Sequence, residues 1–140
     1  MNKDYSKELS DHRLNKAKDL IIQAKLLFNN EQFDGSVNRS YYSIFNAIRA
    51  LLAFLKLDSS KHSGVISFFD RYFVKTGIFC QEFSKIFHTS FDFRQVSDYD
   101  DFYIISIDQA RMQIENCEKF ISEVQNKINQ FLNGEIAFHK

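Results

Sequence analysis

One arginine ends a stripe of aromatic residues, and this position has the strongest requirement for a chemical partner. Phe83, Phe87 and Phe91 recur at intervals of four residues, and Arg94 follows three residues later. Side chains at this spacing share one face of a helix, so an apolar face is predicted to end in a guanidinium group. An unpaired charge in such a place is energetically costly. Arg94 therefore needs an anion, either a protein carboxylate or the phosphate of a ligand.

The nearest candidate anion is Asp98, four residues after Arg94. This spacing allows an ion pair within one helix. Further acidic residues, Asp92, Asp100 and Asp101, surround the pair in the sequence. Their negative charge would repel the backbone of RNA, which argues against a simple nuclease at this position.

A second polar stripe contains two arginines. Its members, at spacings of three, four and three residues, are Arg39, Tyr42, Asn46 and Arg49. Planar guanidinium groups on one helix face suit the binding of phosphate, so these residues are candidate ligand-binding groups. The alternative is that both arginines are solvated or paired with carboxylates of a neighbouring helix.

Lys61 and His62 lie at the predicted start of another helix, in the segment Ser-Lys-His-Ser-Gly. Free backbone N–H groups beside a lysine can bind an anion, and His62 could transfer protons because the pKa of histidine is about 6.5. The segment could equally be a capping turn with an exposed histidine. The other histidines, His12, His88 and His139, lack metal-ligand spacing. We expect no metal and no cofactor.

The two cysteines, Cys80 and Cys117, lie far apart in the sequence and match no ligand motif. We interpret them as reduced thiols in the core of a cytosolic protein. The N-terminal segment lacks the apolar stretch of a signal peptide, and the run Ala50–Leu55 is too short to span a bilayer. The sequence therefore predicts a cytoplasmic protein with no membrane association.

Apolar residues at spacings of three and four predict long helices over residues 14–28, 37–55 and 107–131. We expect a break between the first two at Asp34–Ser36, and a stop at Gly134. A shorter helix capped by Ser59 or Ser60 should end at Gly77, and another should run from about Phe79 into the Arg94 segment. The absence of proline and the presence of only four glycines favour few, long elements.

These elements predict an all-α fold, an up-and-down antiparallel four-helix bundle with an additional short helix. The chain has 140 residues, which fits one domain over residues 1–134 with a frayed tail at residues 135–140. The formal net charge of zero gives no global reason to expect binding to nucleic acid. Crowded aromatic residues, Phe68, Phe69, Tyr72 and Phe73, exceed what one helix face can bury and favour a dimer.

Four short motifs in this order resemble the HEPN family of small prokaryotic helical proteins. They are Asn-Arg-Ser-Tyr-Tyr-Ser-Ile-Phe (38–45), Lys-His-Ser-Gly-Val-Ile (61–66), Phe-Val-Lys-Thr-Gly (73–77) and Arg-Gln-Val-Ser-Asp-Tyr-Asp (94–100). The resemblance runs from about residue 10 to residue 130 and implies a helical bundle that dimerises. It also implies that the protein acts with a minimal nucleotidyltransferase as a toxin–antitoxin pair.

The resemblance further implies a role for Arg94. Active HEPN members are metal-independent ribonucleases in which an arginine holds the scissile phosphate and a histidine shortly after it moves protons. Here the arginine maps to Arg94, but Tyr99, Asp100 and Asp101 occupy the positions of the histidine. A tyrosine with a pKa of about 10 is a poor base at pH 7. In some related members a tyrosine behind the motif is adenylylated, which makes Tyr99 and Tyr103 candidate acceptors.

Three hypotheses follow from the sequence. The first is a HEPN-type protein that binds a nucleotide or a nucleotidyltransferase partner through Arg39, Asn46, Arg94, Asp98 and Tyr99. The second is a divergent ribonuclease in which His62 or Tyr99 replaces the missing histidine beside Arg94. In the third, Arg94 and Asp98 form an ion pair that fixes helix packing, and there is no ligand.

Overall fold

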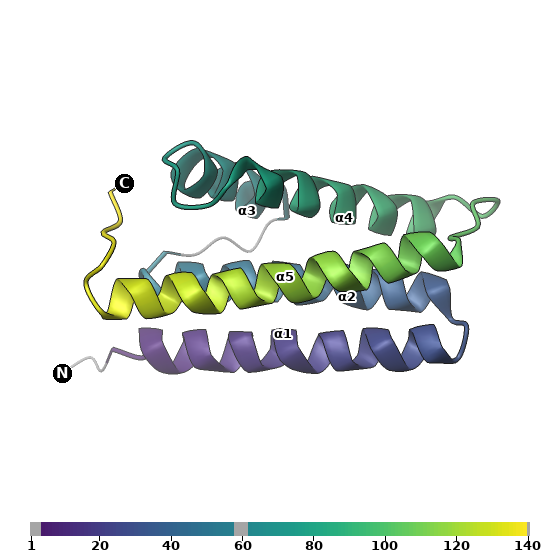
Figure 1. The fold of residues 1–140 in the computed structure, drawn as a ribbon, viewed down its shortest axis with the longest axis horizontal. Helices are drawn as coiled ribbons and strands as arrows, with labels where there is room; N and C mark the ends of the chain where they lie inside the picture. Colours follow the sequence, from purple (N-terminus) through teal and green to yellow (C-terminus); the bar gives the residue numbers. More distant parts are fainter. Residues whose placement is uncertain (1–3, 58–61, 140) are drawn as a thin grey trace.

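The computed structural model describes residues 4–57 and 62–139 of the chain. This part is helical and contains no β-strand (Figure 1). The elements are α1 (Ser6–Asn29), α2 (Phe33–Phe54), α3 (His62–Phe69), a π-helical segment η1 (Asp70–Val74), α4 (Gln81–Tyr99) and α5 (Ile107–Leu132). The predicted all-α class is confirmed.

The four long helices α1, α2, α4 and α5 run in alternating directions along one long axis (Figure 1). Helix α2 packs against each of the other three, and its middle is almost continuously buried. Helix α3 and η1 form the additional short element, which packs against α2 and against α4. The arrangement is an all-α bundle, and α2 is the element around which the others are assembled.

Buried serines join α1 to α2. The hydroxyl groups of Ser36 and Ser43 in α2 donate hydrogen bonds to the carbonyl oxygens of Ala24 and Ala17, at 2.9 and 2.6 Å. Ser10 of α1 donates to the carbonyl oxygen of Ala50 at 2.7 Å. Small side chains on both helices allow this close approach, and the hydrogen bonds satisfy hydroxyl groups that would otherwise be buried without a partner.

The predicted break at Asp34–Ser36 is wrong. Helix α2 already begins at Phe33, and the chain turns instead just before it, where Glu31 has a φ of 60°. Gly35 lies inside α2, at a point where α1 passes close by. A Cβ atom at this position would lie 3.1 Å from Leu27 Cδ1. This glycine permits helix packing and does not end a helix.

The aromatic residues form a core between the α3–η1 segment, α4 and α5. The Phe69 ring contacts the rings of Phe79, Phe87 and Phe120 at centroid distances of 5.0, 5.9 and 5.5 Å, and all four side chains are buried. Offset and edge-to-face pairs of this kind stabilise a core beyond the area that they bury. Of the crowded aromatic residues, Phe69 and Phe73 are buried within their own chain, whereas Phe68 and Tyr72 are only partly buried. The dimer stays a prediction.

Helix α5 ends as its sequence predicts, since Gly134 follows the capping residue with a φ of 72°. The segment after it has no regular secondary structure, yet the Phe138 ring stacks on Phe73 at 5.4 Å. Within the described ranges, no helix has both the length and the apolar character needed to cross a membrane.

Candidate functional site

Arg94 lies near the end of α4 and is largely buried, with 16% of its side chain exposed. Its Nε atom lies 2.9 Å from Oδ2 of Asp98, one helical turn further on. Its Nη2 atom donates a hydrogen bond of 2.9 Å to the hydroxyl oxygen of Tyr42 in α2. The guanidinium group thus has an anionic partner, Asp98, and a neutral partner, Tyr42. The hydrogen bond to Tyr42 links α4 to α2.

Two tyrosine rings cover the guanidinium group. Arg94 Cζ lies 5.7 Å from the centre of the Tyr41 ring and 5.4 Å from that of Tyr42. The Tyr41 ring is fully buried and also contacts Phe91 and Phe87. Burial raises the pKa of Tyr41 well above its ordinary value, although the charge of Arg94 acts in the opposite direction. Tyr41 therefore remains neutral, and its ring face stabilises the cation.

This geometry favours binding and packing over proton transfer. Arginine remains protonated at any physiological pH, and a neutral tyrosine is a weak base. Asp98, whose side chain is 31% exposed, would compete with a ligand phosphate for the Nε side of Arg94. Among the described residues, none of the hydrogen bonds or ion pairs of Arg94 involves a histidine.

The other members of the α2 stripe contact different parts of the bundle. Arg39 donates to the amide oxygens of Gln23 in α1 and of Asn38. Asn46 donates to the backbone carbonyl of Tyr42, one turn earlier. Tyr42 is thus the member that directly contacts Arg94, and the contacts of Arg39 lead toward α1.

Arg49 also lies close to α1. Its backbone carbonyl accepts a hydrogen bond of 3.2 Å from Arg13, and its guanidinium group lies 5.9 Å from the centre of the Phe45 ring. The predicted pocket residues therefore divide into a group at Arg94, formed with Tyr42 and Asp98, and a group along the α1–α2 contact.

Two predicted residues cannot be placed in the site. Lys61 lies outside the described residues, and His62 begins α3 but its side chain is not described. The candidate adenylylation residues differ in exposure. Tyr99 has 75% of its surface exposed, whereas Tyr103 is half-buried and its hydroxyl oxygen accepts a hydrogen bond from Gln109 Nε2.

Large apolar side chains are exposed along the segment from the end of α4 to the start of α5, a feature that sequence reasoning missed. They are strongly exposed: Tyr99, Phe102, Ile104 and Ile107, with 75, 95, 86 and 47% of their surface accessible. We call these four residues the loop patch. The backbone at the C-terminal end of the loop patch is held in place, because Ser106 and Gln109 form a reciprocal capping box at the start of α5. The Ser-x-x-Gln spacing of that box was visible in the sequence.

The two cysteines have different environments. Cys117 is buried, and burial raises the pKa of its thiol to about 12. Cys80 is exposed at the start of α4, so its prediction as a core thiol is wrong. It immediately follows the buried Phe79, which takes the core position at this helix start. No group of three or more potential metal ligands occurs in residues 4–57 and 62–139.

Comparison with known proteins identifies the family of this chain. The model of the HEPN domain matches residues 10–127. The chain belongs to the HEPN family. This HEPN chain is also 35% identical to a UPF0332 protein of Thermotoga maritima, over 81% of this chain and 86% of that protein. Two proteins of Methanocaldococcus jannaschii that are named putative toxins are 29 and 30% identical, each over 94% of this chain and over 90 and 97% of their own lengths.

Proposed function

We propose that this HEPN protein is a binding component of a toxin–antitoxin-like pair whose partner is a minimal nucleotidyltransferase. The observation that carries this proposal is the state of Arg94. Its charge is compensated by Asp98, its remaining contacts are with two tyrosines, and no histidine among the described side chains touches it. Such a site is suited to recognition, because none of the described side chains that contact Arg94 is a histidine able to move protons near neutral pH.

The loop patch supplies a surface for a protein partner. Its apolar side chains alternate along the chain with acids at positions 98, 100, 101 and 108. Exposed aromatic and aliphatic residues are typical anchors of protein interfaces. Asp98 and Asp108 are paired with Arg94 and Arg111, so the negative charge that would repel RNA and attract a basic protein surface comes mainly from Asp100 and Asp101. The patch thus fits a partner with an apolar recess in a basic rim.

Tyr99 is the better acceptor for adenylylation by such a partner. Its ring belongs to the loop patch and is largely exposed, whereas the hydroxyl group of Tyr103 is already engaged by Gln109. In the reaction the phenolic oxygen of Tyr99 would attack the α-phosphate of ATP. A phosphodiester bond to AMP would form, pyrophosphate would leave, and the phenolic proton would pass to a base of the transferase.

The decisive test is incubation of the purified protein with ATP and the minimal nucleotidyltransferase of the same genome, followed by peptide mass spectrometry. We expect one AMP group on Tyr99, loss of the modification in Tyr99→Phe, and retention in Tyr103→Phe. Tyr5→Phe provides a control, since Tyr5 is also exposed but lies at the start of α1. The proposal fails if the two proteins neither form a complex nor yield a modified tyrosine.

The relatives named as toxins favour one alternative, a divergent ribonuclease built on Arg94. Incubation with a labelled RNA, in parallel with Arg94→Ala, tests it. Cleavage that disappears in the variant would establish the nuclease and overturn the binding proposal. Cleavage that survives in the variant would indicate contamination, and we expect no Arg94-dependent cleavage.

A further inference from the structure

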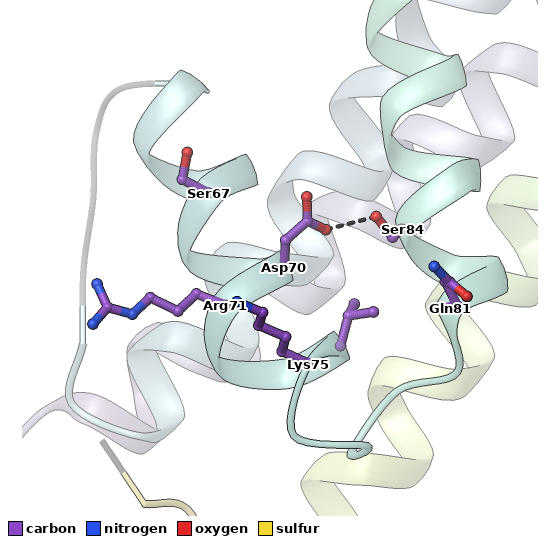
Figure 2. A pocket seen from close by; sticks show the side chains of 7 residues that line it. Ser67, Asp70, Arg71, Lys75, Gln81 and Ser84 are labelled. Carbon is purple, nitrogen blue, oxygen red and sulfur yellow. Dashed lines mark hydrogen bonds between the residues drawn. The ribbon is translucent and has the colours of Figure 1, made fainter.

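A cleft of about 790 Å³ opens beside η1 and the first turns of α4 (Figure 2). Its polar lining comes from Ser67, Asp70, Arg71, Lys75, Gln81 and Ser84. Ser84 precedes Arg94 by ten residues on α4, which corresponds to about 15 Å along the helix axis. The cleft is therefore separate from the site at Arg94.

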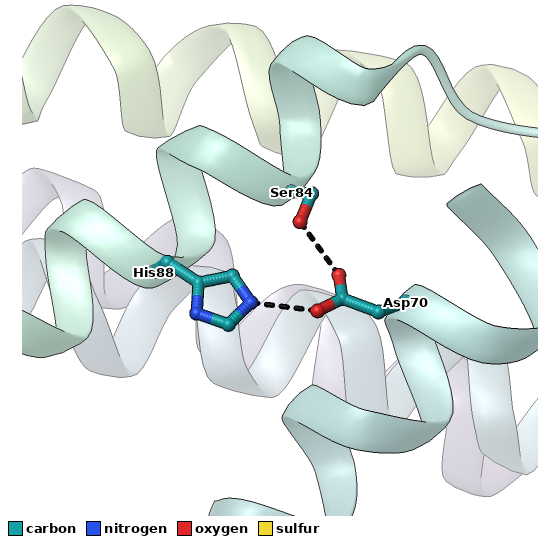
Figure 3. A network of polar contacts seen from close by, with 3 residues as sticks. All are labelled: Asp70, Ser84 and His88. Carbon is teal, nitrogen blue, oxygen red and sulfur yellow. Dashed lines mark hydrogen bonds and ion pairs between the residues drawn. The ribbon is translucent and has the colours of Figure 1, made fainter. Parts of the chain in front are cut away.

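The one carboxylate of this lining is already occupied by protein groups. Ser84 Oγ donates to Asp70 Oδ1 at 2.7 Å, and His88 Nε2 lies 2.6 Å from Asp70 Oδ2 (Figure 3). Both oxygens of Asp70 are thus engaged by α4. The carboxylate therefore anchors η1 to α4, and both of its oxygens are occupied by protein partners.

The other polar groups of the lining are hydrogen-bond donors. Lys75 and Arg71 form no ion pair with any carboxylate of residues 4–57 and 62–139. The Arg71 guanidinium lies 5.2 Å from the centre of the Tyr72 ring, and its side chain extends away from Ser84 and Gln81 (Figure 2). The Lys75 side chain also extends away from Gln81, toward Arg71 (Figure 2), so the two exposed cations lie at the same edge of the cleft.

The backbone of η1 determines where the side chains of Asp70 and Lys75 lie. The N–H group of Lys75 donates to the carbonyl oxygen of Asp70 at 2.9 Å, which closes a π turn from residue i to residue i+5. Turns of this kind are rare and occur frequently at functional sites. Here the turn places Asp70 against α4, while Lys75, at its other end, has no carboxylate partner among the described residues.

We propose that this cleft binds a phosphate group of a small ligand. Lys75 and Arg71 provide positive charge at one edge of the cleft, and Ser67 and Gln81 provide neutral donors. The network of Asp70, Ser84 and His88 holds the two walls of the cleft together. Two cations and neutral donors, around a site whose one carboxylate already has two protein partners, match a phosphate in charge and hydrogen bonding.

The test is a titration of the isotopically labelled protein by NMR, with inorganic phosphate in one arm and ribose 5-phosphate in the other, at constant ionic strength. We expect saturable shifts of the backbone amide signals of residues 70–77 and 81–84. The Lys75→Gln variant should weaken the affinity by at least about tenfold, because it removes a charge-assisted hydrogen bond. A stronger response to ribose 5-phosphate would identify a phosphomonoester as the ligand class.

Lys85→Gln is the matched control, since Lys85 is an exposed lysine of α4 that does not line the cleft. Its affinity should remain within about twofold of the parent, a difference of less than half a kcal/mol. Three outcomes would overturn the proposal: no saturable shifts in either arm, equal weakening by both substitutions, or shifts confined to the Arg94 region. Unchanged amide signals outside the cleft in Lys75→Gln would show that the variant is folded.

Discussion

The hydrogen bond from Arg94 Nη2 to the Tyr42 hydroxyl group joins α4 to α2 across 52 residues of sequence. Together with Asp98 on the same helix, it engages the guanidinium group of Arg94 on two sides. The residue that marks the family motif is consequently also a tie between two helices of the bundle. Its substitution should change both stability and any activity of the site.

Arg94→Ala should lower the free energy of unfolding by about 1–3 kcal/mol, because it removes a charge-assisted hydrogen bond and the contacts with two rings. Tyr42→Phe should cost about 1 kcal/mol, and the double variant should cost less than the sum of the two. Urea denaturation measures each value. Arg111→Ala serves as control, since its pair with Asp108 is exposed and should contribute less than about 1 kcal/mol. Strict additivity of Arg94→Ala and Tyr42→Phe would contradict the coupling.

Phe120→Ala should lower the free energy of unfolding by about 3–5 kcal/mol, as is usual when a large buried ring is removed. The Phe120 ring is fully buried and contacts the rings of Phe69, Phe83 and Phe87. Phe102→Ala removes the same group from a site with 95% exposure and should change stability by no more than about 0.5 kcal/mol. Equal effects of the two substitutions in thermal or urea denaturation would mean that the aromatic core is misassigned.

The two thiols should react with Ellman's reagent at very different rates. Cys80 is exposed, whereas Cys117 is buried and its pKa is raised to about 12. Because the thiolate is the reactive species, one thiol should react promptly in the native protein and the second only on addition of denaturant. In Cys80→Ser the rapid phase should disappear. Two rapid equivalents in the native protein would show that the α2–α5 interface opens easily.

Stability should fall at alkaline pH. The Cys117 thiol ionises at about pH 9 when it is unfolded but at about 12 when it is folded, so the unfolded state releases a proton first. Between these values the linkage reduces the free energy of unfolding by up to about 1.4 kcal/mol per pH unit. Tyr41, whose pKa is also raised by burial, adds to the loss above pH 10. In Cys117→Ala the decline should be shallower, and an identical decline would refute the role of the thiol.

Periodicity predicted much of the bundle because its helices carry continuous apolar faces. The seam from Ile107 to Phe131 became α5, and Gly134 ended it. The Arg94–Asp98 pair followed from helical spacing alone. These features depend on residues within one helix, for which the sequence fixes the distance between side chains.

Features that depend on two elements could not be predicted in this way. The contact of Arg94 with Tyr42 requires the register between α4 and α2, and the pairing of Asp70 with His88 requires the turn of η1. Gly35 was misinterpreted for the same reason, since the approach of Leu27 that requires it is a contact between helices. Local propensity favoured a break there, and tertiary packing overrode it.

The short turn between α1 and α2 has a consequence for the order in which the chain folds. The two helices are neighbours in sequence and pack along their whole lengths, with serine hydroxyl groups of α2 on the carbonyl oxygens of α1. Closing so short a loop costs little chain entropy, and contacts between neighbouring segments form fastest. We therefore expect the α1–α2 hairpin to be the folding nucleus. Helix α5 should pack onto it first, followed by α3, η1 and α4 with their aromatic side chains.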